Sequence, residues 1–288
     1  MNRLLALCSL ALFGASLAPA QRAEDYLDIF IANVKPDKRA DFDIVARKIA
    51  DANRKAKGDA WIAAEVEYGQ GNTVYFISTR KDYAAIDSAT TTFMNAIKEA
   101  YGPGGMKKME SDLNNTIAST RSEIRRRRWD LSVNAPKDPD AYLKLVAEAR
   151  WLRTIRIVVR PGHELEFEES VKQAKSALEQ NAPPWTFFVS QTSVGEPGVV
   201  YYISTLQPSL AAFDSMPSLR KLFGDEVFAK WLKSSADYEA NSETILLRFL
   251  PELSNPPEDI AKVSPDFWHP KPTAAAKPKS AEPAKTGQ

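Results

Sequence analysis

Cysteine and histidine are scarce in this chain of 288 residues, which contains one cysteine and two histidines. Cys8 lies in an apolar N-terminal segment that we expect to be removed, so disulfides and thiolate chemistry are excluded from the mature protein. His163 follows a predicted strand in a PGHE turn, where we expect it at the surface, and His269 lies near the C-terminus. A zinc site needs three or four nitrogen or sulfur ligands. We therefore expect neither a metal nor a cofactor.

An excess of charge of one sign is also missing. The whole chain has 38 basic and 37 acidic residues, and the first 20 residues hold one charged residue, Arg3. The four consecutive arginines Arg125–Arg128 divide between the two faces of a predicted strand and so form no continuous basic patch. Nucleic acid is therefore an unlikely class of partner by charge. No apolar stretch reaches the ~20 residues that span a membrane, so no transmembrane segment is predicted.

Both ends of the chain differ from a globular sequence. Residues 1–20 combine a basic start (MNR), an apolar run (LLALCSLALFGASL) and the small-residue site Ala18-Pro19-Ala20, which is typical of a secretory signal peptide. We expect cleavage after Ala20 and a periplasmic or secreted protein. Residues 255–288 form a Pro/Ala/Lys-rich tail, which we expect to be disordered from about residue 271 because it lacks large apolar side chains there.

A hexapeptide occurs twice, as VYFIST at Val74–Thr79 and as VYYIST at Val200–Thr205. The flanking sequences match in the same order, with Trp61 falling on Trp185 and the spacing staying between 124 and 127 positions. Such a register over many residues indicates a tandem duplication. The predicted organisation is a first repeat at residues 21–132, a linker at 133–149 and a second repeat at 150–254.

Each repeat predicts the element order β-α-β-β-α-β, a split βαβ or ferredoxin-like unit. The first strand ends at a proline, an amphipathic helix follows, and two strands then form a hairpin. Glycines in YGPGG and LFGD break the second helical stretch of each repeat, before closing strands near residues 123–129 and 244–250. Helices would cover one face of each sheet and leave the other face to be buried by the second repeat.

The strand–proline–helix passage VRPGHELEFEESV (159–171) and the passage VYYISTLQPSLAAFDSM (200–216) resemble the dimeric α+β barrel superfamily. That superfamily includes antibiotic-biosynthesis-monooxygenase-like, NIPSNAP-like and EthD-like proteins. The resemblance implies an α+β fold in which two ferredoxin-like repeats pack sheet to sheet as a pseudo-dimeric barrel within a monomer. It also implies a cavity between the sheets. Relatives that use haem place a histidine on a helix facing this cavity, and no predicted helix here contains one.

Arg156 is the leading candidate for ligand binding. Strand alternation over residues 154–159 turns the apolar residues toward the helices and Arg156 into the barrel. Arg126 and Arg248 occupy roughly matching places in the two closing strands, although a shift of one residue would turn either outward. The three guanidinium groups could bind an anionic ligand. The alternative is structural ion pairing with strand carboxylates such as Glu65 and Glu67.

Four aromatic residues fall at matched places in the two repeats and could line an apolar pocket or fill the core: Trp61, Trp185, Tyr75 and Tyr201. Three functions stay open. The first is a binding protein for a small apolar or anionic ligand, the second a cofactor-independent monooxygenase or isomerase, and the third a filled structural barrel. Fold analogy alone does not choose among them. The catalytic residues stay unassigned.

Overall fold

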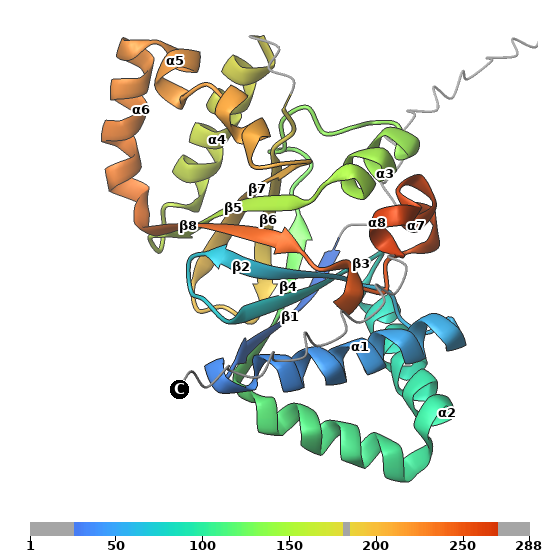
Figure 1. The fold of residues 1–288 in the computed structure, drawn as a ribbon. Helices are drawn as coiled ribbons and strands as arrows, with labels where there is room; N and C mark the ends of the chain where they lie inside the picture. The colour runs from blue at the N-terminus through green and yellow to red at the C-terminus, as the bar shows by residue number, and fades with distance from the viewer. Residues whose placement is uncertain (1–25, 181–184, 270–288) are drawn as a thin grey trace, which may run out of the picture.

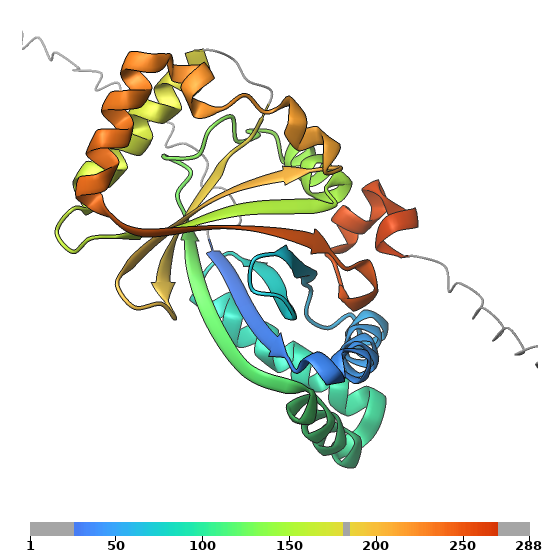
Figure 2. The same ribbon diagram turned by 60° about the vertical axis from the view of Figure 1, so that its left-hand side comes forward.

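The computed structural model describes residues 26–180 and 185–269, so the predicted signal peptide and the tail from residue 271 lie outside the described residues. Eight antiparallel strands form one closed barrel in the order β1-β3-β2-β8-β5-β7-β6-β4. Helices α1 and α2 lie on one side of the barrel, and α4, α5 and α6 lie on the opposite side (Figures 1 and 2). Helices α3 (Pro139–Glu148), α7 (Glu258–Val263) and α8 (Pro265–Trp268) gather at one end (Figure 1).

The two repeats have the predicted β-α-β-β-α-β order. The first consists of β1 (Tyr26–Val34), α1 (Arg39–Ala56), β2 (Ile62–Tyr68), β3 (Thr73–Arg80), α2 (Tyr83–Thr116) and β4 (Ile117–Arg127). The second consists of β5 (Trp151–Val159), α4 (Glu164–Gln180), β6 (Phe188–Val194), β7 (Val199–Gln207), α5 (Leu219–Phe223), α6 (Asp225–Tyr238) and β8 (Glu239–Phe249). Pairing of β2 with β8 and of β4 with β6 joins the two sheets and closes the barrel.

The predicted glycine breaks are confirmed. Gly102 interrupts α2 with φ 66° and ψ 175°, and Gly224 separates α5 from α6 with φ 77° and ψ 166°. These angles are open to glycine and strained for any other residue. Each break lets the chain fold back over its sheet, as Figure 1 shows for α2.

Matched aromatic residues anchor the helices to the sheets. Phe42 of α1 and Phe167 of α4 are both almost completely buried. The ring of Phe167 lies 4.5 Å from that of Tyr201 and 5.7 Å from that of Tyr238, measured between centroids. Burial of a side chain of this size contributes about 1.5–3 kcal/mol, so each anchor is a substantial part of the stability of its repeat.

The segments predicted as linker and tail contain three helices: α3 (Pro139–Glu148), α7 (Glu258–Val263) and α8 (Pro265–Trp268). Trp268 is fully buried, and its indole Nε1 donates a hydrogen bond of 3.0 Å to the backbone oxygen of Ala147. The guanidinium of Arg150 lies 3.7 Å from the ring centroid of Phe267. The three helices therefore form a cap that packs on one end of the barrel.

The matching hexapeptides do not occupy equivalent positions in the two sheets. Ile29 of β1 pairs with Ile77, whereas Thr154, its counterpart in β5, pairs with Ser204. The second repeat is therefore shifted by one residue relative to the sequence match. Because a shift of one residue turns a side chain to the other face of a sheet, the counterpart of Tyr75 is Tyr202. Residue pairing by sequence alone was wrong at this point.

Candidate functional site

The interior of the barrel has one apolar wall and one polar wall. Strands β1, β2 and β8 contribute apolar side chains, including Ile29, Ile31, Ile62, Ala64, Ile245 and Leu247. Strands β4 and β5 contribute polar and charged side chains, including Arg121, Glu123, Arg125, Arg127, Thr154 and Arg156. The two closing strands thus differ, although β4 and β8 have the same length of 11 residues and almost the same burial pattern.

Glu123 is the central acidic group of the polar wall and is 1% exposed. Its Oε2 accepts from Arg125 Nε at 2.8 Å and lies 2.7 Å from Arg125 Nη2, while Arg121 Nη2 lies 2.7 Å from Oε1. The Tyr202 hydroxyl donates to Oε2 at 3.2 Å, and the Arg125 guanidinium lies 3.3 Å from the centroid of the Tyr202 ring. A buried carboxylate is tolerated here because two guanidinium groups and a hydroxyl surround it.

Glu196, in the turn between β6 and β7, is the second acidic group. Arg156 donates to it through Nε at 3.1 Å and Nη2 at 2.8 Å, and Arg121 Nη1 lies 3.2 Å away. Burial acts to raise the pKa of Glu196, but the hydrogen bonds from Arg156 and the charge of Arg121 outweigh it and hold the pKa below its ordinary value. Burial raises the pKa of Tyr202, so its hydroxyl stays protonated at neutral pH, and its single proton is shared between Glu123 at 3.2 Å and Glu196 at 3.0 Å.

A cavity of about 130 Å³ lies inside the barrel between the polar wall and the cap. Its polar lining residues include Arg125, Arg127, Thr154, Ser190 and Ser204. Apolar side chains line much of the rest of the cavity, including Leu27, Ile62, Ile77, Val146, Phe249 and Ile260. The cavity therefore combines positive charge and hydroxyl-bearing side chains with a hydrocarbon surface.

Arg127 is the cation of this cavity that lacks a carboxylate. Its Nη2 donates a hydrogen bond of 2.7 Å to the Tyr142 hydroxyl, and its guanidinium lies 5.2, 5.5 and 5.9 Å from the ring centroids of Trp129, Tyr142 and Phe188. No acidic side chain lies within ion-pair distance of it among residues 26–180 and 185–269. Its Nε is buried without a hydrogen-bond partner in the same part of the chain. Arg127 thus has donor capacity that the described residues leave unused.

The structure places the three predicted arginines differently from one another. Arg156 faces the interior as predicted, but Glu196 neutralises it. The inward placement of Arg126 and Arg248 was wrong, since both are exposed on the outer surface of their strands. Arg248 instead pairs with Glu65 and Glu67, as the structural alternative predicted. The role of all three in ligand binding stays a prediction.

The four predicted aromatic residues lie partly in the barrel interior and partly on the helix side of the sheets. Tyr75 packs half-buried against the interior cluster, and burial raises the pKa of its hydroxyl. Trp61 is buried, lines the interior cavity and donates through Nε1 to the backbone oxygen of Leu253 at 2.8 Å. Tyr201 faces the helices, because of the register shift, and donates to Glu168 at 2.6 Å. Trp185 lies on the helix side of the second repeat and does not reach the interior.

Arg125 and Arg127 were not predicted to face the cavity, although the sequence of the second closing strand contains the pattern that places them there. Residues 245, 247 and 249 of the second closing strand are all large and apolar. These three side chains identify the buried face of the strand, so Arg248, which lies between two of them, must face outward. Matching the two closing strands then turns Arg126 outward and brings Arg125 and Arg127 inside.

The strand order and barrel closure define the class: the chain has the dimeric α+β barrel fold, built from two repeats of one chain. No family model matches the sequence, and no curated protein matches it either. Several solved structures have similar folds. A proposed monooxygenase from Fusobacterium nucleatum is 13% identical with a TM-score of 0.49, covering 80% of this chain and 94% of its own.

Two other solved structures have related shapes. An anthrone oxidase-like protein is 10% identical with a TM-score of 0.49, covering 80% of this chain and 92% of its own. A chlorite dismutase from Candidatus Nitrospira defluvii is 10% identical with a TM-score of 0.46, covering 85% and 97%. Likenesses this distant do not transfer an activity to this chain.

Residues 26–180 and 185–269 have two further properties. They hold no group of three or more histidine, cysteine, aspartate or glutamate side chains arranged to bind a metal. Their helices include none with both the length and the hydropathy needed to cross a bilayer.

Proposed function

We propose that the protein is an exported binding protein for a small organic anion, held inside the barrel with its negative group on Arg127. The observation that carries this proposal is the contrast among the interior arginines. Arg121, Arg125 and Arg156 all have carboxylate partners, whereas Arg127 has none among the described residues. A guanidinium binds a carboxylate through charge-assisted hydrogen bonds, and the buried Nε of Arg127 has no hydrogen-bond partner among the described residues.

The size and lining of the cavity define the ligand further. A volume of about 130 Å³ is close to the ~150 Å³ of an engineered apolar cavity that binds benzene. The apolar lining of the cavity suits one ring or a short chain, and the hydroxyl-bearing residues Thr154 and Ser190 also line it. The ligand class is therefore a small aromatic or short aliphatic carboxylate.

Calorimetric titration with benzoate tests this proposal, with benzyl alcohol as a neutral probe of the same shape. Arg127→Met should weaken benzoate binding by about 10- to 100-fold, because a hydrogen bond to a charged group is worth roughly 1.5–3 kcal/mol. Arg126→Met is the matched control, since Arg126 is the exposed neighbour on the same strand. Equal binding of benzoate and benzyl alcohol, or equal losses in the two variants, would refute the proposal.

Native mass spectrometry of protein purified from its own source addresses both the ligand and export. Export rests on the N-terminal sequence pattern and predicts a mature chain that begins at Gln21. A mass excess that disappears on denaturation would identify the natural ligand, and the same spectrum would show whether the protein is the predicted monomer. A protein that retains residues 1–20 would contradict export by this route.

An enzyme acting without a cofactor is the second candidate, because Arg125 and Tyr202 form a buried pair next to the cavity. Burial raises the pKa of Tyr202, which disfavours the phenolate that a general base requires. The hydroxyl is directed to Glu123 and Glu196. The arrangement thus supports binding better than proton abstraction. Oxygen uptake by the purified protein with an activated phenol, lost in Tyr202→Phe, would favour the enzyme instead.

A further inference from the structure

A second cavity lies outside the barrel, between the outer face of the first sheet and helices α1 and α2. Its volume is about 320 Å³. Aromatic side chains from four elements surround it: Phe30 of β1, Phe42 of α1, Phe76 of β3 and Phe93 of α2, with Trp61 directly before β2. This is the layer in which a sheet and its helices normally form a close-packed core.

The break in α2 explains why this layer is not filled. Phe93 comes from the half of α2 before Gly102, and Leu113 comes from the half after it. The two halves diverge from the break, as Figure 1 shows. Each half contributes a side chain to the lining of the same cavity. Phe30, Phe76 and Phe93 stay only half-buried although they lie between a sheet and helices. Their exposed surface faces a space large enough for an organic molecule.

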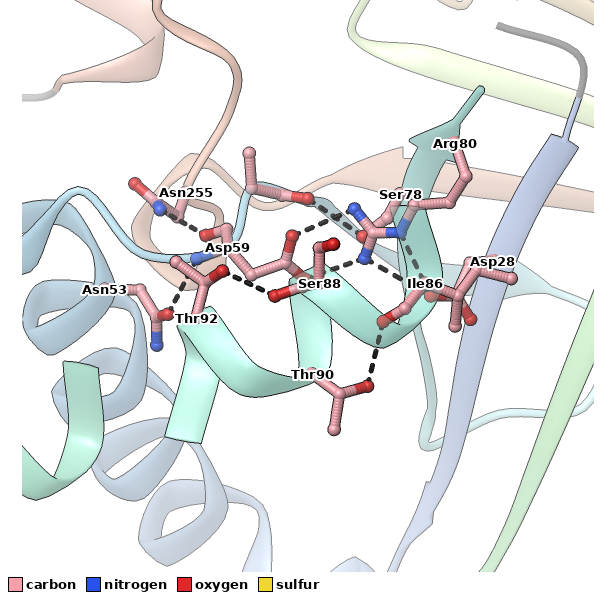
Figure 3. Close-up of polar contacts among 11 residues, drawn as sticks. Asp28, Asn53, Asp59, Ser78, Arg80, Ile86, Ser88, Thr90, Thr92 and Asn255 are labelled. Carbon is pink, nitrogen blue, oxygen red and sulfur yellow. Dashed lines mark hydrogen bonds and ion pairs between the residues drawn. The ribbon is translucent and has the colours of Figure 1, made fainter. Parts of the chain in front are cut away.

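One end of this cavity is polar and carries an excess of negative charge. Arg80 is 8% exposed and donates to both oxygens of Asp59, at 2.9 and 2.7 Å, and through Nε to Asp28 Oδ2 at 3.2 Å. Figure 3 shows the guanidinium enclosed between the two carboxylates. Asp28 Oδ1 accepts no hydrogen bond from the described residues. Two carboxylates thus surround one guanidinium, and one acceptor oxygen is available.

We propose that this cavity is a binding site for an organic cation, with its ammonium group at Asp28 and its apolar part among the aromatic rings. Aromatic faces attract ammonium groups, and the unbalanced carboxylate disfavours an anion. The site lies on the other face of the sheet from the interior cavity, although Trp61 and Ser78 line both, and the inference does not depend on the proposed function. It would take a primary or quaternary ammonium with one ring or a short chain.

The second repeat supports this assignment by contrast. It has a cavity of similar size, about 330 Å³, on the helix side of its own sheet. Strand pairing places Arg153 there at the position of Asp28 and Gln207 at the position of Arg80. Arg153 lines that cavity. The acidic end is therefore a property of the first repeat and does not follow from the fold.

The test is calorimetric titration at pH 7 of the mature chain with three probes that differ only in the head group: 2-phenylethylammonium, 2-phenylethanol and phenylacetate. We expect the ammonium to bind at least about tenfold more tightly than the alcohol. Asp28→Asn should remove this preference while keeping the fold, because Arg80 retains its two bonds to Asp59. Asp43→Asn is the matched control, since Asp43 is a similarly exposed, Arg-paired aspartate outside the cavity.

Two more variants locate the site. Ala46→Leu adds three carbon atoms at a buried position that lines the cavity and should abolish binding of the ammonium in a folded protein. Arg127→Met should leave ammonium binding unchanged, which separates this inference from the anion site. No preference for the ammonium, no effect of Asp28→Asn, or undiminished binding in Ala46→Leu would each overturn the proposal.

Discussion

The buried carboxylate of Glu123 should be one of the most sensitive positions of the barrel. It is 1% exposed and holds Arg125, whose side chain is 7% exposed, through contacts of 2.7 and 2.8 Å. The matching position in the second closing strand is Ile245, and Arg125 matches Leu247. Glu123→Ile therefore places in the first repeat the residue that the second repeat already accommodates. The change removes the negative charge and leaves Arg125 buried.

The expected cost of the single substitution is about 3–5 kcal/mol, the range found when one partner of a buried ion pair is removed. The double variant Glu123→Ile with Arg125→Leu should regain most of this loss, because replacing a whole buried pair by apolar residues is often neutral or stabilising. Arg121 does not prevent the recovery, since its side chain is 43% exposed and can turn to solvent.

Urea unfolding at pH 7, followed by far-UV circular dichroism, measures these free energies. Glu166→Gln serves as the control because Glu166 is an exposed glutamate of α4, and it should change the free energy of unfolding by less than about 0.5 kcal/mol. A cost below about 1 kcal/mol for Glu123→Ile would show that Arg125 does not depend on this partner. A double variant as unstable as the single one would show that the polar wall is needed for the fold itself.

Two other predictions concern the stability of glycine variants in α2 and the pH dependence of the stability that Glu168 provides. Gly102→Ala should destabilise the protein by roughly 1–3 kcal/mol, because a Cβ there meets no atom and the cost comes from the positive φ alone. Gly104→Ala, also in open space but with an ordinary φ, should be neutral or stabilising, and thermal unfolding compares the two. The hydrogen bond from Arg128, aided by that from Tyr201, lowers the pKa of Glu168. The ionised Glu168 therefore stabilises the fold above its ordinary pKa of 4.5, and this contribution is lost as the pH falls through the lowered pKa. The difference in the free energy of unfolding between wild type and Glu168→Gln should shrink between about pH 5 and pH 2, as measured by urea unfolding.

The fold could be predicted from sequence because each signal was local and occurred twice. Prolines after the first strands, the hydrophobic periodicity of the helices and the glycine breaks are properties of short segments, and the duplication repeated them in order. The cap could not be predicted in this way. Its helices α7 and α8 have six and four residues and depend on the burial of Trp268 and its neighbours against α3.

The candidate site was predicted only in part because it depends on strand register. The inward orientation of Arg156 was predicted correctly, because the side chains around it in β5 alternate between an apolar face and a polar face. Tyr201 and Arg126 were misplaced, because an error of one position in matching strands reverses every side chain. The partner of Arg156 could not be foreseen either, since Glu196 lies in a turn 40 positions away.

Duplication within one chain explains how the interior came to have two different walls. In a barrel made from two identical chains, symmetry presents every inward residue twice, once from each closing strand. A second copy of Glu123, Arg125 and Arg127 would place charged groups on both walls, and little hydrocarbon surface would then face the cavity. Because β4 and β8 belong to one chain, β8 can carry Ile245, Leu247 and Phe249 while β4 carries the charges. An asymmetric interior of this kind suits a ligand with one charged end and one apolar end, which a symmetric barrel would bind in two equivalent orientations.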